Sequence, residues 1–79
     1  MTISAAVNPS VEVLEIKGPD GAVISQVTIA AIQSLKAYYQ VDVVPMVADQ
    51  IAGEAAVHGV RLSRDEVATV IAPFVNPAP

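Results

Sequence analysis

The sequence predicts an α+β fold, in which an N-terminal β-hairpin is followed by three short α-helices packed as one small domain. Three observations lead to this fold class. The segment GPDG (18–21) separates two stretches rich in valine and isoleucine, a helical spacing of apolar residues begins after Thr28, and S-x-x-E follows Gly59. These patterns are typical of a hairpin turn, an amphipathic helix and a helix start. The length of 79 residues leaves room for one domain.

The hairpin is predicted from the turn and from the residues on both sides of it. VEVLEIK (11–17) and AVISQVTI (22–29) are rich in β-branched residues, which favour strands. Pro19 presets φ at the first central position of the turn, Asp20 suits the next position, and Gly21 accepts a positive φ. A two-stranded hairpin alone is marginal in water, so it must pack on the helices or gain strands from another chain.

The first two helices are predicted at about 29–40 and 44–58. Thr28 or Ser25 is the candidate N-cap of the first helix. In the second helix Pro45 suits the first turn, although a residue before proline resists helical geometry and the start could therefore be Pro45 itself. Gly59 ends this helix, since glycine favours the left-handed C′ position. The apolar stripes that support the two helices are Ile29, Ile32, Leu35 and Tyr39, then Val44, Val47, Ile51 and Ala55.

The third helix, at about 64–72, has the clearest local pattern. Ser63 and Glu66 match a capping box, in which each side chain accepts a backbone N–H from the other residue. Pro73 should end the helix near Ala72, because proline breaks a helix interior. The expected organisation is an N-terminal arm (1–10), a single α+β domain (11–75) and a C-terminal tail (76–79).

Composition indicates a protein that associates with other chains. Apolar residues make up 53% of the sequence, above the usual value of about 45–50%, and there are no cysteines to form disulfides. A domain of this size has too much surface to bury so many apolar side chains, and a single core of this size supplies roughly 3–5 kcal/mol. We therefore expect an exposed apolar patch, which is typical of an interaction site.

Charge and hydropathy argue against nucleic acid and membranes as partners. Eight acidic and four basic residues give a net charge of −4, which repels nucleic acid and anionic lipid. No run of 18 apolar residues is free of charge or proline, so we expect no membrane span. Residues 1–8 lack the basic start and the apolar stretch of a signal peptide. The expected location is the cytoplasm, or the interior of a larger assembly such as a virion.

A helix-turn-helix is the alternative interpretation of the second and third helices. The connection from Gly59 to Leu62 has a suitable length for this motif. Arg61 and Arg64 would then be the nucleic-acid ligands, and duplex DNA the partner. Specific binders commonly neutralise about 6–10 phosphates. This chain has four cations in all, and Asp65 and Glu66 follow Arg64 directly, so two helices packed in a small core are the favoured interpretation.

Catalytic and metal sites have little support. His58, the only histidine, lies four residues after Glu54 on one helical face, and Asp49 is near that face. The favoured interpretation places His58 in the last helical turn, where an imidazole suits the helix dipole. Ser63 with His58 suggests a nucleophile and a base, but Ser63 has a role as a helix cap and no G-x-S-x-G elbow surrounds it. We expect no enzyme activity, no catalytic residue, no metal and no cofactor.

The sequence thus predicts a small, acidic, non-enzymatic interaction or assembly subunit that forms homo-oligomers or binds another protein. A virion accessory protein and a subunit of a bacterial complex fit this class equally. Two features stay open: Tyr38 and Tyr39 could contact a partner or flank the core, and Gly53 could mark close helix packing within one chain or between two. The residues expected at an interface are Val11, Val13, Tyr38, Tyr39, Val57 and Phe74.

Overall fold

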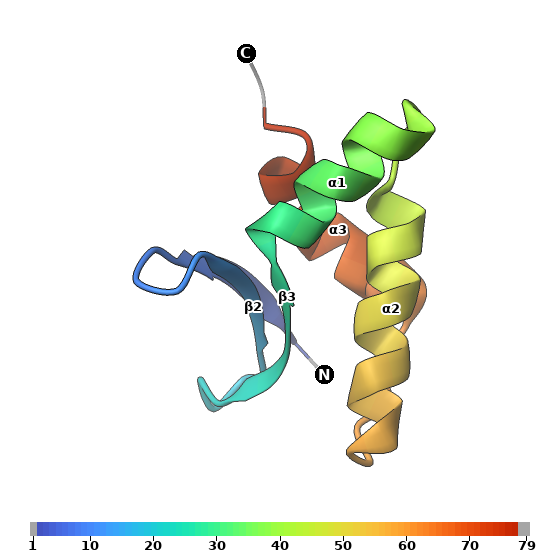
Figure 1. Ribbon diagram of the computed structural model, residues 1–79. Helices are drawn as coiled ribbons and strands as arrows, with labels where there is room; N and C mark the ends of the chain where they lie inside the picture. The colour runs from blue at the N-terminus through green and yellow to red at the C-terminus, as the bar shows by residue number, and fades with distance from the viewer. Residues whose placement is uncertain (1, 78–79) are drawn as a thin grey trace.

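The computed structural model describes residues 2–77, which form a three-stranded antiparallel sheet followed by three helices (Figure 1). The strands, in the spatial order β1-β2-β3, are β1 (Ser4–Asn8), β2 (Val13–Lys17) and β3 (Val23–Thr28). The helices are α1 (Ile29–Tyr39), α2 (Val44–Val57) and α3 (Arg64–Val75). The predicted α+β class is confirmed, with the hairpin and the three helices in the expected order.

The sheet contains one strand more than the predicted hairpin. Residues 4–8 of the expected N-terminal arm form β1, which pairs with β2 from Ser4 opposite Lys17 to Asn8 opposite Val13. The small side chains of this segment give no local strand pattern, so its strand geometry depends on the ladder that β2 offers it. Met1, also assigned to the arm, lies outside the described residues, as do residues 78–79 of the expected tail.

The turn between β2 and β3 has the predicted geometry. Gly21 has φ 84°, and its N–H donates to the carbonyl oxygen of Gly18 at 3.0 Å. The Oδ1 atom of Asp20 accepts the N–H of Ala22 at 3.1 Å. Just beyond the turn, β3 carries one extra residue, Ile24, because Ser25 lies opposite Ile16 while Val23 lies opposite Lys17. This β-bulge bends the strand beside the turn.

Side-chain caps fix where α1 and α3 begin. Thr28 Oγ1 accepts the N–H of Ala31 at 3.1 Å, which identifies Thr28 rather than Ser25 as the cap of α1. Ser63 Oγ accepts the N–H of Glu66 at 3.3 Å at the start of α3. At the end of α2, Gly59 has φ 83°, as the sequence predicts. Local sequence signals therefore set these helix ends.

The end of α3 differs from the prediction, because Pro73 lies inside the helix and does not end it. Proline in a helix interior costs about 3 kcal/mol, so other contacts must offset the break. Val75 is buried, and its carbonyl oxygen accepts a hydrogen bond from Lys36 Nζ at 2.7 Å. The N–H of Asn76 donates to the carbonyl oxygen of Ala72 at 2.9 Å. Tertiary contacts thus hold the last turn.

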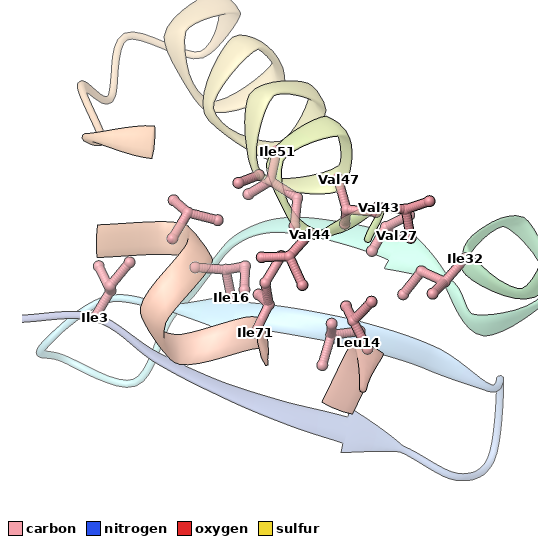
Figure 2. Close-up of a cluster of buried hydrophobic side chains, with 13 residues drawn as sticks. Ile3, Leu14, Ile16, Val27, Ile32, Val43, Val44, Val47, Ile51 and Ile71 are labelled. Atoms are coloured by element: carbon pink, nitrogen blue, oxygen red, sulfur yellow. The ribbon is translucent and has the colours of Figure 1, made fainter. Parts of the chain in front are cut away.

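The core lies between one face of the sheet and the helices. Figure 2 shows Leu14 and Ile16 of β2 pointing toward Ile51 of α2 and Ile71 of α3. These four side chains are almost completely buried. The predicted apolar stripe of α2 is also buried at Val44, Val47, Ile51 and Ala55. No helix in the part of the chain that the structure describes covers the other face of the sheet (Figure 1).

Candidate interaction surface

Large apolar side chains remain exposed on several elements of the folded chain. They occur in loops and near the ends of strands and helices, with the densest group at the end of α1. In the described part of the chain they are Val7, Val11, Val23, Tyr38, Tyr39, Val41, Val57 and Phe74. The composition predicts exposed apolar side chains of this kind, because the chain has more of them than a small core can bury.

The six residues expected at an interface have different environments. Tyr38 is 80% exposed, Val57 is 82% exposed, and Val11, Tyr39 and Phe74 are also exposed. Val13 is only 8% exposed, because it lies on the central strand with Asn8 opposite on one side and Thr28 on the other. Val13 therefore belongs to the interior of the sheet and is not a contact residue. Of the other five, Tyr38 and Tyr39 share the end of α1, whereas Val11 lies in the β1–β2 loop, Val57 on α2 and Phe74 on α3.

Tyr38 and Tyr39 form the most prominent feature of this surface. Their ring centroids are 4.8 Å apart, and the ring planes meet at 76°, an edge-to-face geometry that aromatic pairs favour. Tyr39 is 48% exposed, so it does not join the core. The Tyr39 ring thereby supports the Tyr38 ring, which projects into solvent from the last turn of α1.

A groove with a volume of about 490 Å³ lies beside this tyrosine pair. One wall is a face of α1, and Gln50 of α2 contributes to the other side. Its lining residues are Ala31, Ser34, Leu35, Tyr38, Tyr39 and Gln50. No Asp, Glu, Lys, Arg or His lines this groove. Tyr38 and Tyr39 thus border a shallow depression that is mostly apolar and uncharged.

The groove lies on a part of α1 that is only partly buried. Ile32 is the one fully buried residue of α1, and it packs in the hydrophobic core. Lys36 carries the only charge of the helix and binds the end of α3. Ala31 and Leu35 pack partly against the core, and the remainder of their surface is exposed in the groove.

The groove itself was not predicted from the sequence. Leu35 was expected in the apolar stripe of the helix and does pack against the core, but its exposed side also lines the groove, and Ala31 was not assigned to any site. The signal that identifies their common face is the spacing of Ala31, Leu35 and Tyr38, since residues three and four apart are neighbours on a helix. Gln50 has no such signal, because its position beside α1 depends on the packing of α2.

A larger groove, of about 720 Å³, lies between the β2–β3 turn and the end of α2. Among its lining residues, Asp20 and His58 carry ionisable side chains, and the others are small or apolar. The Asp20 carboxylate already accepts the N–H of Ala22 and holds the turn. The lining contains no serine, threonine or cysteine that could act as a nucleophile.

The candidate catalytic and metal residues do not assemble into a site within residues 2–77. No group of three or more His, Cys, Asp or Glu side chains there could hold a metal ion. Asp49 lies 3.7 Å from Arg64 in an exposed ion pair. His58 is the C-cap residue of α2, and its backbone N–H donates to the carbonyl oxygen of Ala55 at 3.1 Å. Ser63 caps α3.

The helix-turn-helix alternative places Arg61 in the turn and Arg64 at the start of α3, and both are exposed. Arg64 Nη1 is 3.7 Å from Asp49 Oδ2, and Asp65 and Glu66 occupy the first turn of α3. The start of α3 thus has two acids within the helix and a third paired with its arginine. This arrangement weakens the attraction of the helix for phosphate.

Comparison with known proteins adds no relative to this picture. No protein family, no curated protein and no solved structure matches the chain. In residues 2–77, no helix has both the length and the apolar character needed to cross a membrane. The tyrosine pair and the groove beside it are therefore the features of this chain that bear on its function.

Proposed function

We propose that this chain is a small, non-enzymatic assembly subunit that acts by binding protein and forms homo-oligomers. The observation that carries the proposal is the exposed tyrosine pair at the end of α1, which borders an uncharged and mostly apolar groove. Tyrosine is enriched at protein interfaces because its ring offers a large contact area and its hydroxyl tolerates water. An exposed aromatic surface of this kind favours protein as the ligand.

The modest size of the core supports the same proposal. The chain has 79 residues, no disulfide and a single apolar core. At this size one core supplies roughly 3–5 kcal/mol, and small domains commonly gain further stability from association. A partner that binds only the folded chain raises its stability by mass action. Self-association would thus serve both the assembly and the stability of its subunit.

The location that we propose is the cytoplasm or the interior of a larger assembly such as a virion. The lack of cysteine makes the fold independent of an oxidising compartment. The net charge of −4 favours solubility over binding to anionic surfaces. Two kinds of protein fit this location, namely a virion accessory protein and a subunit of a bacterial complex.

The mass of the protein in solution tests the proposed function. Light scattering behind a sizing column should give a mass above 8.2 kDa that increases with concentration over a hundredfold range. An oligomer is expected because burial of the exposed aromatic surface is favourable. A constant mass of one chain at every concentration would contradict a self-associating subunit.

Duplex DNA is the second candidate partner, because the start of α3 and both arginines are exposed. A DNA-binding role requires duplex affinity that falls steeply with salt and weakens in Arg61→Ala and Arg64→Ala. We expect no such binding, since Asp49, Asp65 and Glu66 surround Arg64. Titration of a labelled duplex at low and at physiological salt distinguishes the two functions.

A further inference from the structure

The α1 surface is the tyrosine pair together with its groove, which is lined by Ala31, Ser34, Leu35, Tyr38, Tyr39 and Gln50. We infer that the partner on this surface is a second copy of the chain, related by a twofold axis that pairs the two α1 helices antiparallel. In this dimer, Tyr38 of each copy occupies the groove of the other copy. The inference rests on the proposed function, because it assigns the surface through which self-association occurs.

The first argument is that the exposed Tyr38 ring forms one border of a shallow groove, so that a projecting group and a receiving surface lie side by side. Tyr38 is 80% exposed, and the groove next to it has a volume of about 490 Å³. A twofold interface requires one patch that is complementary to itself, so that each copy both donates and receives a group. A ring beside a groove satisfies this requirement, whereas a groove alone would need a different partner.

The second argument concerns charge. Each chain carries a net charge of −4, so two copies repel one another over most of their surface. The groove has no charged lining residue. The one charge of α1, on Lys36, is directed to the carbonyl oxygen of Val75 in α3. The α1 surface is therefore a place where two acidic chains can meet without bringing like charges together.

The geometry of the helix gives the position of the axis. If Tyr38 of one copy packs against Ala31 of the other, the antiparallel pair is centred between Ser34 and Leu35, midway along α1. Ser34 is exposed and lines the groove. Gln33 is also exposed, but it lines a different groove with Ile29 and Ala30. Positions 33 and 34 thus form a matched pair of probes.

Interface size indicates a weak dimer. A stable interface buries roughly 800 Å² on each partner, about a sixth of the 4897 Å² surface of this chain. The exposed parts of the two tyrosines supply about 300 Å² of that area. We therefore expect dissociation in roughly the micromolar range. Raising the salt concentration should strengthen the dimer, since salt screens the repulsion between two acidic chains.

The first test measures the dimer dissociation constant by sedimentation equilibrium for three forms of the full chain. Tyr38→Ser should weaken the dimer by roughly tenfold or more, as expected for a central aromatic anchor. Gln26→Ser changes an exposed side chain of β3 that does not line the groove, and its constant should stay within about twofold of the original. Circular dichroism of Tyr38→Ser checks that the variant is folded.

The second test uses the lack of native cysteine. Ser34→Cys should form a disulfide-linked dimer when a mild oxidant is added, because the two copies of position 34 lie near the axis. Gln33→Cys should stay mostly monomeric under the same treatment. This readout is independent of the tyrosine substitution and requires no change in stability.

The outcomes separate the inference from the function on which it rests. Weakening by Tyr38→Ser together with selective cross-linking of Ser34→Cys supports the α1 pair. If Tyr38→Ser leaves the dissociation constant unchanged and Ser34→Cys and Gln33→Cys cross-link equally, the α1 pair is overturned. Self-association itself would then still stand. A chain that is monomeric at every concentration overturns both.

Discussion

The ammonium group of Lys36 lies 2.7 Å from the carbonyl oxygen of Val75, although the two residues are 39 positions apart in the sequence. This bond joins α1 to the last turn of α3. A second link lies nearby, where Asn76 Nδ2 donates to Asp42 Oδ1 at 3.0 Å. The end of the third helix is thus held by the first helix and by the segment between the first two helices.

Lys36→Met should lower the free energy of unfolding by about 1–2 kcal/mol, since it keeps the aliphatic stem but removes a hydrogen bond from a charged donor. Chemical denaturation measures the effect, at a protein concentration below the dissociation constant of any oligomer. Lys17→Met is the control, because Lys17 forms only a 4.0 Å surface pair with Glu15. Equal stability of the Lys36→Met variant and the original chain would contradict a role of this bond in holding α3.

Ser63→Ala should destabilise the protein by about 1 kcal/mol, because the N–H of Glu66 loses its acceptor at the start of α3. Ser63→Asp keeps an acceptor oxygen at the cap and should restore most of the loss. Thermal unfolding of the two variants side by side measures the difference. If both variants lose the same stability, the hydroxyl has another role.

Ser25→Ala should raise the free energy of unfolding by about 1 kcal/mol. The side chain of Ser25 is 3% exposed, and its hydroxyl oxygen has no hydrogen-bond partner among the described residues. A buried polar group without a partner is unfavourable, so its removal is a gain. Urea denaturation measures the change, with exposed Ser4→Ala as the control, expected within about 0.5 kcal/mol of the original. A loss of stability in Ser25→Ala would reveal a partner for the hydroxyl.

Gly53→Ala should stabilise the protein by about 1 kcal/mol, because alanine favours a helix interior and an added Cβ would meet no atom within 4 Å. Gly59→Ala should have the opposite effect, since Gly59 has φ 83°. Calorimetry measures both changes. The dimer constant of Gly53→Ala should stay the same, and a weaker dimer would place the contact on α2 instead of α1.

Local signals predicted the parts of the fold that depend on a few neighbouring residues. The turn at 18–21, the cap at Ser63 and the helix end at Gly59 each follow from the chemistry of a single short stretch. β1 and the last turn of α3 could not be predicted in this way. β1 needs the ladder of β2, and the turn after Pro73 needs Lys36, so both depend on residues distant in the sequence.

The candidate surface was predicted in part for the same reason. The tyrosines were identified from their residue type, since tyrosine is enriched at interfaces. Val13 was misplaced, because a third strand beside β2 buries it. Gln50 was missed, because the approach of α2 to the groove is a tertiary feature. Residue type therefore indicates which side chains favour contact, and packing decides which of them remain available.

The bulge at Ile24 limits how copies of this chain can add to one another. β3 is an edge strand, and its extra residue interrupts the regular spacing that an incoming strand would need. At the opposite edge, β1 is five residues long and is followed directly by Pro9. Edge-to-edge growth of the sheet, which leads to filaments, is therefore hindered on both sides. Self-association should then give small closed oligomers and not fibres.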